Sequence, residues 1–187
     1  MDIEKRLKAM EKKFKDDSFL NNRGLGNDIP FYIFDYLPKD ELKVRNYIKN
    51  EVLKNFRLED AIKIVEIDLF EVMIEVLKEL DIFEEVFELE KDMDSEYMFE
   101  KLKKAATSDD LAEKIIKRGK DNTIILLTGV GRVYPILRSH NILNKIQNYF
   151  DTQKVVLFFP GEYTKTDLIL FKKFNDNNYY RAFKLIE

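Results

Sequence analysis

The sequence has no cysteine and only one histidine among its 187 residues. A chain without cysteine can form no disulfide, no zinc site with thiolate ligands and no cysteine nucleophile, and it is typical of a reducing compartment. Histidine and carboxylate residues also show no spacing that is typical of metal ligands. We therefore expect a cytoplasmic protein with no metal and no other cofactor.

An excess of charge of one sign and long hydrophobic runs are missing as well. The 32 basic and 35 acidic residues leave a formal net charge of -3, so DNA binding would need a local basic patch. No apolar run approaches the roughly 18 residues of a membrane span, and the charged start, MDIEKRLKAMEKKF, is unlike a signal peptide. We expect a soluble protein that does not bind a membrane.

Hydrophobic residues nevertheless make up 45% of the chain, which is enough for a folded core. Short apolar runs typical of strands lie at 29–36, 61–70, 122–128 and 154–160. Residues 168–174 and 179–186 could each add a strand, with NDNN as the turn between them. Apolar residues at helical spacing lie at 38–56, 69–89, 94–105, 108–119 and 134–150.

This alternation predicts an α/β fold, with one three-layer domain over residues 1–187 and a mainly parallel sheet of about four to six strands flanked by helices. It would be Rossmann-like or P-loop-like without a nucleotide motif. Residues 68–119 would form a helical, insert-like segment. Its helix at 69–89, which a break near Asp81 could interrupt, is apolar on most sides and is predicted to be largely buried. Thr107, three residues before Asp110, indicates a capping box at the start of the helix at 108–119.

Residues 1–20 are predicted to contain an N-terminal amphipathic helix. Its hydrophobic residues form one narrow stripe on an otherwise charged surface: Ile3, Leu7, Met10 and Phe14. We expect this stripe to pack on the helix's own domain. Binding of a partner is the alternative.

The segment IILLTGVGRVYPILRSHN, residues 124–141, has the outline of a nucleotide-binding turn. Walker A needs a lysine and a hydroxyl after its glycines, and the dinucleotide fingerprint needs a glycine where this chain has Tyr134. Both motifs fail. Three hypotheses remain for the turn: a structural turn with Pro135 opening the next helix, a loop that contacts a protein, or a small anion site strengthened by Arg132 and Arg138.

Single polar residues carry little chemistry by themselves. His140 lacks a partner that spacing could supply, so packing or hydrogen bonding is favoured over binding or catalysis. Asp35 and Asp68 lie at strand ends, where Mg²⁺ ligands could be placed, although capping of the following helix explains them at least as well. We assign no catalytic residue.

Four separated stretches together resemble one known family. They are RGLGNDIPFYIFDYLPKDEL, LLTGVGRVYPILRSHNILNKIQ, VVLFFPGEY and NDNNYYRAFKLI. Their sequences and their order are similar to those of the BrxB family of bacteriophage-exclusion (BREX) defence systems. The resemblance covers roughly residues 23–186, is weak over about 70–118 and is almost absent from the first 20 residues.

The resemblance implies a small component of a multi-protein anti-phage system, and no established catalytic motif comes with the family. Other BREX components include an ATPase, a DNA methyltransferase and a phosphatase-like PglZ protein, which is our first-choice partner. We expect an adaptor that helps to assemble the complex through protein–protein contacts. Any contact with DNA would occur only within the complex.

Two alternatives stay open, an accessory subunit that binds DNA and a domain that binds an anion or acts as an enzyme. The second needs Arg132, Arg138 and His140 to converge on a cleft at the carboxyl edge of the sheet, with Asp35 as an optional fourth member. The candidates for a partner or ligand surface lie within the four stretches: Arg23, Asn27, Asp28, Asp35, Gly129, Gly131, Arg132, Arg138, His140, Asn141, Asn178, Tyr179 and Arg181.

Overall fold

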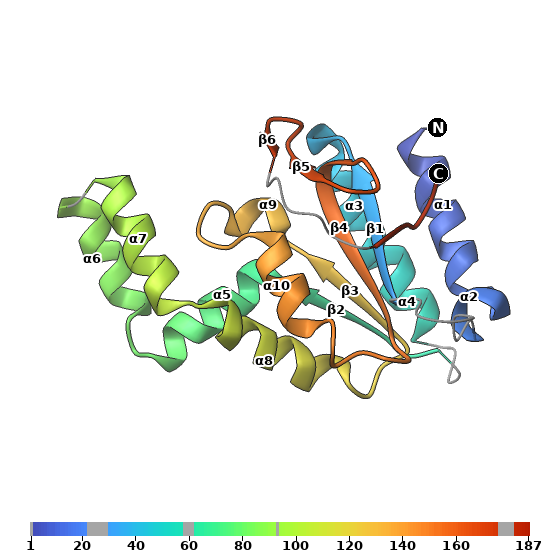
Figure 1. Ribbon diagram of the computed structural model, residues 1–187, viewed down its shortest axis with the longest axis horizontal. Coiled ribbons are helices and arrows are strands. Elements are labelled where there is room, and N and C mark those ends of the chain that lie inside the picture. The colour runs from blue at the N-terminus through green and yellow to red at the C-terminus, as the bar shows by residue number, and fades with distance from the viewer. Residues whose placement is uncertain (1, 22–29, 58–61, 93, 176–181) are drawn as a thin grey trace.

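A central β-sheet of seven strands organises the computed structural model, which describes residues 2–21, 30–57, 62–92, 94–175 and 182–187 (Figure 1). Its parallel part has the order β2-β3-β4-β1-β7. These strands are β1 (Phe31–Tyr36), β2 (Ile64–Asp68), β3 (Ile124–Thr128), β4 (Lys154–Tyr163) and β7 (Phe183–Lys184).

The other strands make the sheet mixed, which corrects the prediction of a mainly parallel one. β5 (Leu168–Leu170) pairs antiparallel with the end of β4, and β6 (Phe174–Asn175) pairs antiparallel with β5. Residues 164–167 are too few for the crossover that a parallel neighbour would need, so β4 can only fold back on itself. The remaining prediction, an α/β fold with helices on the sheet, is confirmed.

Alternate residues of the central strands enter two separate hydrophobic cores. Ile125 and Leu127 of β3 face one core, and Ile124 and Leu126 face the other. Both faces of the sheet are therefore buried, which explains the continuous apolar runs in the sequence. The first core packs against α5 (Leu69–Glu79), α8 (Ser108–Gly119) and α10 (Ser139–Ile146), and the second against α1 (Ile3–Phe14), α2 (Asp17–Asn21), α3 (Glu41–Tyr47) and α4 (Leu53–Phe56).

The predicted helix at 38–56 is present but irregular. It begins with the 3₁₀ turn η1 (Pro38–Asp40) and contains a π-helical segment, η2 (Ile48–Val52), between α3 and α4. The capping box before α8 is confirmed, because Thr107 accepts a hydrogen bond from the backbone N–H of Asp110 and the Asp110 carboxylate accepts from the N–H of Thr107.

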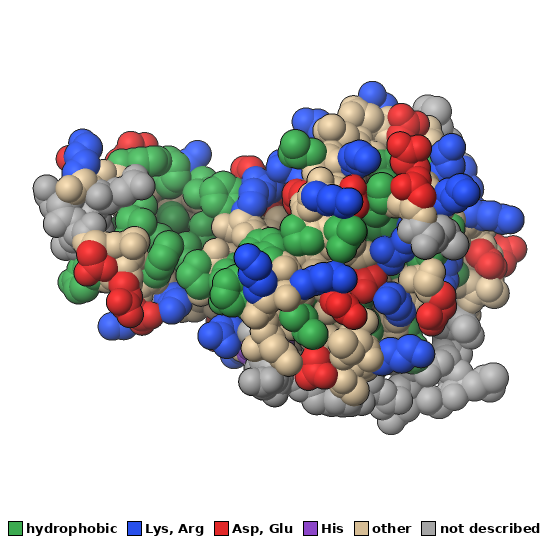
Figure 2. Space-filling model, turned by 90° about the horizontal axis from the view of Figure 1, so that it is seen from above, with side chains coloured by type: hydrophobic (Ala, Val, Ile, Leu, Met, Phe, Trp, Pro, Cys, Tyr) green, Lys and Arg blue, Asp and Glu red, His purple; other side chains and the backbone are tan. Residues whose placement is uncertain are grey.

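The predicted burial of residues 69–89 is wrong for the second half of that segment. The chain breaks at Asp81, which has a φ of 57°, and a new helix α6 (Phe83–Asp92) follows. None of the described side chains of α6 is fully buried. With α7 (Ser95–Ala105), α6 forms an arm that projects from the sheet and its covering helices (Figure 1). Hydrophobic side chains gather over this arm (Figure 2).

The predicted helix at 134–150 is also wrong at its start. Tyr134 has an extended backbone, as residues before a proline usually have, so the helix cannot pass through it. The four-residue α9 (Val130–Val133) precedes it, and α10 begins only at Ser139. Within the described residues, no helix is both long and apolar enough to cross a membrane.

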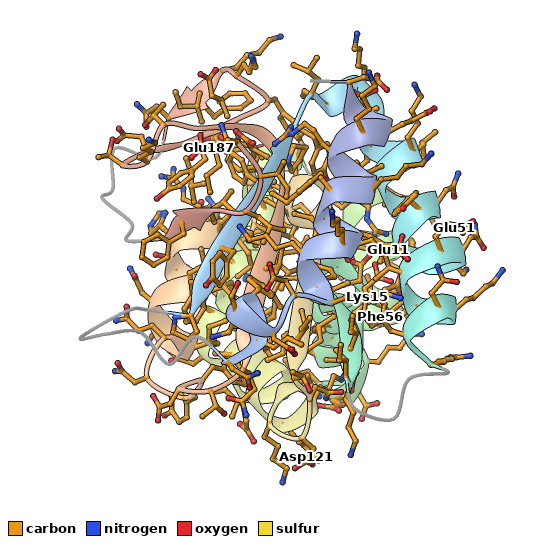
Figure 3. The ribbon with its side chains drawn as sticks, turned by 90° about the vertical axis from the view of Figure 1, so that its right-hand side faces the viewer. Glu11, Lys15, Glu51, Phe56, Asp121 and Glu187 are labelled. Atoms are coloured by element: carbon orange, nitrogen blue, oxygen red, sulfur yellow. The ribbon has the colours of Figure 1, made fainter. Side chains whose placement is uncertain are left out.

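The stripe on α1 packs on the helix's own domain, as predicted. Ile3, Leu7, Met10 and Phe14 are all buried in the second core. Polar contacts join α1 to the helices beside it: Glu11 accepts hydrogen bonds from Tyr47 and Asn55, and the Lys15 ammonium lies 5.0 Å from the centre of the Phe56 ring (Figure 3).

Replacing Leu7 or Phe14 by Ala should lower the free energy of unfolding by about 2–5 kcal/mol, because truncation of a fully buried side chain leaves a cavity. Lys8→Ala, on the exposed face of the same helix, is the control and should change it by less than about 0.5 kcal/mol. Urea unfolding measures all three variants. Equal stability of Leu7→Ala and Lys8→Ala would contradict the packing of α1.

Candidate functional site at the carboxyl edge of the sheet

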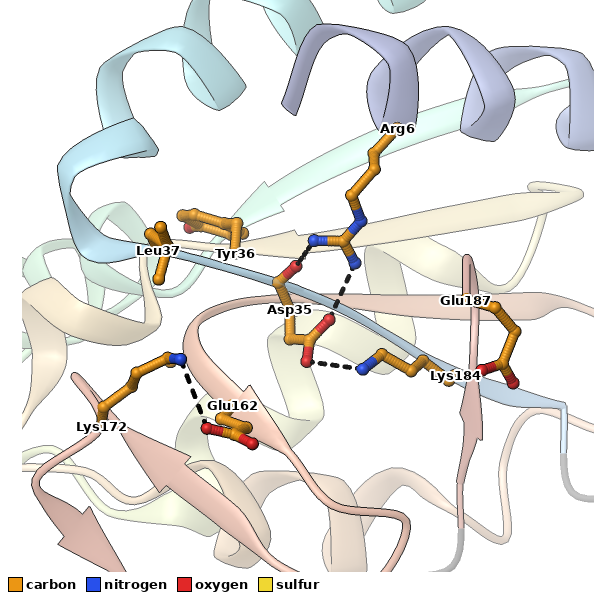
Figure 4. A pocket seen from close by; sticks show the side chains of 9 residues that line it. Arg6, Asp35, Tyr36, Leu37, Glu162, Lys172, Lys184 and Glu187 are labelled. Carbon is orange, nitrogen blue, oxygen red and sulfur yellow. Dashed lines mark hydrogen bonds and ion pairs between the residues drawn. The ribbon is translucent and has the colours of Figure 1, made fainter. Parts of the chain in front are cut away.

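Charged residues cluster where β1 and β4 end, at the edge where open α/β sheets usually bind ligands. A cavity of about 280 Å³ opens there. Asp35 of β1 lies at its centre (Figure 4). The other lining residues are Arg6, Tyr36, Leu37, Gly161, Glu162, Lys172, Lys184 and Glu187.

The Asp35 carboxylate is buried, and both of its oxygens already have partners. Arg6 donates from Nη2 to Oδ1 at 2.8 Å and from Nη1 to the Asp35 backbone carbonyl at 2.6 Å. Lys184 Nζ lies 3.1 Å from Oδ2, and the backbone N–H of Tyr163 donates to the same oxygen at 3.1 Å. These contacts join α1, β4 and β7 to β1. Asp35 therefore links these elements, and both of its oxygens are engaged by groups of the protein itself.

Two other polar groups around this cavity, Glu162 and Tyr36, are paired as well. Glu162 lies 3.4 Å from Lys172. The hydroxyl of Tyr36 donates to Glu41 at 2.6 Å. Burial, with the nearby Glu41 charge, raises the pKa of Tyr36 far above its usual value. The phenol therefore stays neutral and acts as a hydrogen-bond donor.

A second cluster lies at the ends of β2 and β3, around the glycine turn. Asp68 caps α5 by accepting hydrogen bonds from the backbone N–H groups of Phe70 and Glu71, as the capping interpretation predicted. Its second oxygen pairs with Arg132. Arg132 also lies over the Phe70 ring, 4.9 Å from its centre.

Gly129 is required by the same arrangement. Its φ of 78° is a left-handed conformation, and a Cβ atom at this position would collide with the Asp68 carboxylate. The anionic group beside this turn is thus the protein's own Asp68 carboxylate. Because Arg132 is neutralised by Asp68 and Glu71 and α9 has only four residues, the anion-site hypothesis loses its support.

Beside this turn, Glu66 of β2 is a carboxylate on a partly buried strand. Its Oε1 accepts a hydrogen bond from Thr128 Oγ1 at 2.8 Å. Burial raises the pKa of Glu66, and the neighbouring charge of Asp68 adds to the shift, against the lowering effects of Thr128, Arg45 and Arg132. The protein therefore holds this charge at a cost in stability.

The two clusters are separate, so the structure does not bring the optional member Asp35 together with Arg132. Asp35 on β1 and Asp68, the partner of Arg132, on β2 lie three strand positions apart, or about 14 Å. Arg138 is exposed just before α10, and His140 and Asn141 lie in the first turn of that helix.

Gly131 lies against the Phe171 ring. The remaining candidates, Arg23, Asn27, Asp28, Asn178, Tyr179 and Arg181, lie outside the described residues. That the candidate residues together form a surface for a partner or ligand stays a prediction.

Sequence reasoning missed the partners of these carboxylates. Arg6 and Lys184 lie at opposite ends of the chain, and no local pattern links them to Asp35. Glu66 could have been recognised, since an acidic residue within an apolar strand is unusual.

Comparison with known proteins identifies the family. Residues 65–185 match the family described as BREX protein BrxB. A relative of that description from Bacillus cereus (strain H3081.97) is 42% identical over 191 residues, which cover 99% of this chain and 98% of the relative. The chain belongs to the BrxB family. A second BREX protein BrxB, from Escherichia coli O9:H4 (strain HS), is 31% identical over 98% of this chain and 92% of its own length. No solved structure gives a significant match.

The family places this protein in the BREX system of anti-phage defence, as the resemblance implied. Both relatives align with almost the whole chain. The similarity is therefore wider than the predicted residues 23–186 and includes the N-terminal helix that carries Arg6.

Asp35→Asn should lower the free energy of unfolding by about 3–5 kcal/mol, because it leaves the partly buried charges of Arg6 and Lys184 without their counter-ion. Glu162→Gln is the control. Its ion pair with Lys172 is half exposed, so it should cost less than about 1 kcal/mol. Urea unfolding compares the two, and equal losses would show that Asp35 is not the link between α1, β1 and β7.

Glu66→Gln should raise the melting temperature at neutral pH. Glu66 has a higher pKa in the folded than in the unfolded state, so its ionised form destabilises the fold at any pH above the folded value. Glutamine removes that charge and can still accept from Thr128. The gain should shrink as the pH falls through the folded pKa of Glu66 and vanish below the unfolded pKa of about 4.3, where both states bind the proton.

Thermal unfolding at a series of pH values measures this effect. Glu85→Gln, at an exposed position of α6, is the control and should show no such trend. A gain for Glu66→Gln that stays constant or grows at low pH would contradict the assignment.

Proposed function

We propose that the protein is a non-catalytic adaptor that helps to assemble a BREX complex through protein–protein contacts. The observation that carries this proposal is the internal pairing of charges at the carboxyl edge of the sheet. Asp35 is paired with Arg6 and Lys184, and Arg132 is paired with Asp68. Catalysis needs an acid, a base or a nucleophile that can reach a substrate, and these groups are occupied by one another.

The projecting arm supports a role in protein contacts. Leu80, Phe87 and Tyr97 are 50%, 47% and 46% exposed, and they belong to α6, α7 and the turn before them. Apolar and aromatic side chains that project together into solvent are typical of protein–protein contact surfaces. A PglZ-type protein is the first-choice partner, by its association with the family.

Co-purification with the BREX components encoded beside this protein tests the proposal. A tagged full-length chain, expressed with the complete system, should recover at least one component, with the PglZ-type protein expected first. Recovery of the chain alone under all conditions would contradict the adaptor role.

The arm can be tested in the same assay. Phe87→Asp combined with Tyr97→Asp should reduce recovery of the partner by about tenfold, because charged groups would enter an apolar contact. The melting temperature should fall only slightly, since each side chain is about half exposed and neither belongs to the buried cores. Tyr149→Asp, at an aromatic residue that is 63% exposed and lies outside the arm, is the control and should leave recovery unchanged.

A further inference from the structure

The outer edge of β2 has no partner strand among the described residues. β2 is the last strand of the order β2-β3-β4-β1-β7 and pairs only with β3. The carbonyl of Lys63 accepts a hydrogen bond from Ile124 of β3, so the odd-numbered residues that follow it also point towards β3. The backbone N–H and C=O groups of Ile64 and Glu66 therefore point outwards.

A groove follows this edge. One hollow, of about 530 Å³, is lined by every residue from Ile62 to Glu66. A hollow on one face of the sheet would be lined by alternate residues, so this one lies beside the strand edge. A second hollow, of about 710 Å³, shares Leu53, Arg57 and Glu66 with the first.

The second hollow also reaches both faces of the sheet. Its lining includes Lys49 of η2 on one face and Arg118 of α8 on the other. The groove therefore has walls on both faces of the sheet and the edge of β2 as its floor. Such a groove could hold one more strand beside β2. The π-helical segment η2 forms part of one wall, and such segments are frequent at functional sites.

The walls of the groove are positively charged. Lys49, Lys54, Arg57 and Lys63 are exposed, and within the described part of the chain none of them has an ion pair or a side-chain hydrogen bond. Of the acidic lining residues, Asp68 and Glu71 are paired with Arg132, and Glu66 accepts a hydrogen bond from Thr128. The charges left to meet a ligand are therefore mostly basic.

We propose that this groove binds an extended acidic segment of another protein, which adds to β2 as a further strand. The proposal rests on the adaptor role and names one surface for it. The outward backbone groups of Ile64 and Glu66 supply the hydrogen bonds, as in other cases of strand addition. Leu53 and Phe56 supply an apolar wall, and the basic residues at the rim select acidic side chains.

The same features favour a peptide over a nucleic acid. A strand edge offers donors and acceptors in alternation, which a peptide backbone matches and a phosphate backbone, with acceptors alone, does not. The five residues of β2 span about 16 Å, enough for a segment of similar length.

Photo-crosslinking in cells that carry the complete BREX system tests the proposal. p-Benzoylphenylalanine is placed in the full-length chain at position 63, on the rim of the groove, or at the control position 149, which is exposed elsewhere. Position 63 should crosslink to one segment of negative net charge in a co-purifying BREX protein. Lys49→Glu, Lys54→Glu and Arg57→Glu together should lower the crosslink yield about tenfold through charge repulsion.

The matched control makes the same charge change on α1, with Lys5→Glu, Lys8→Glu and Lys12→Glu at exposed positions outside the groove. It should leave the crosslink from position 63 unchanged. If both triple variants lower the yield equally, net charge rather than the groove governs binding, and the proposal is wrong.

Amide hydrogen exchange at single-residue resolution gives a readout that only strand addition would produce. In the isolated protein, the amides of Ile64 and Glu66 should exchange quickly and those of Val65 and Ile67 slowly, because only the latter pair bonds to β3. In the complex, Ile64 and Glu66 should become protected. Unchanged exchange at both would overturn the proposal.

The other outcomes separate this proposal from the adaptor role. A BREX component that co-purifies but never crosslinks to position 63 would leave the adaptor role standing and overturn the groove. A crosslink from position 63 to nucleic acid would show that the groove binds nucleic acid instead of a peptide, and it would overturn the proposal. If no BREX component co-purifies, the adaptor role fails. In that case a crosslink to an acidic segment of a different protein would support the groove alone, and no crosslink would overturn both.

Discussion

The buried carboxylate of Asp35 connects parts of the chain that no local interaction could bring together. Arg6 comes from the first helix, Lys184 from the last strand and the Tyr163 amide from the end of β4, and all three meet on β1. A buried charge is tolerated only when its hydrogen-bonding capacity is filled, so these segments depend on Asp35 as much as it depends on them. The helix that closes the second core is thereby tied to the middle of the sheet.

This use of charge shows how an α/β architecture can place its own ion pairs at the edge where a ligand site is usually found. The turn after β3 resembles a phosphate-binding loop in outline, but the Asp68 carboxylate fills the space beside Gly129 and neutralises Arg132. The same helix-capping and ion-pairing interactions that would hold a ligand in another protein stabilise the protein itself here. The contacts that we propose lie at surfaces away from this edge.

Two such surfaces expose groups that a partner could contact, and the groups differ in kind. The arm of α6 and α7 exposes apolar side chains. The outer edge of β2, which has no partner strand among the described residues, offers backbone groups beside exposed basic residues. Lysine and arginine at a strand edge oppose pairing between identical copies, because like charges would meet. An acidic segment would remove that repulsion, so the same residues that keep the edge free could select its partner.

The sequence by itself determined the α/β class, the burial of the stripe on α1, the break near Asp81, the capping box at Thr107 and membership of the BrxB family. All of these follow from periodicity, from signals a few residues apart or from similarity along the chain. Tertiary structure alone decided the mixed sheet, the late start of α10, the exposure of α6 and the pairing of Asp35 with Arg6 and Lys184. The physical reason is the range of the interaction: an apolar pattern shows that a face can be buried, but only the order of the strands decides what buries it and which distant charges meet.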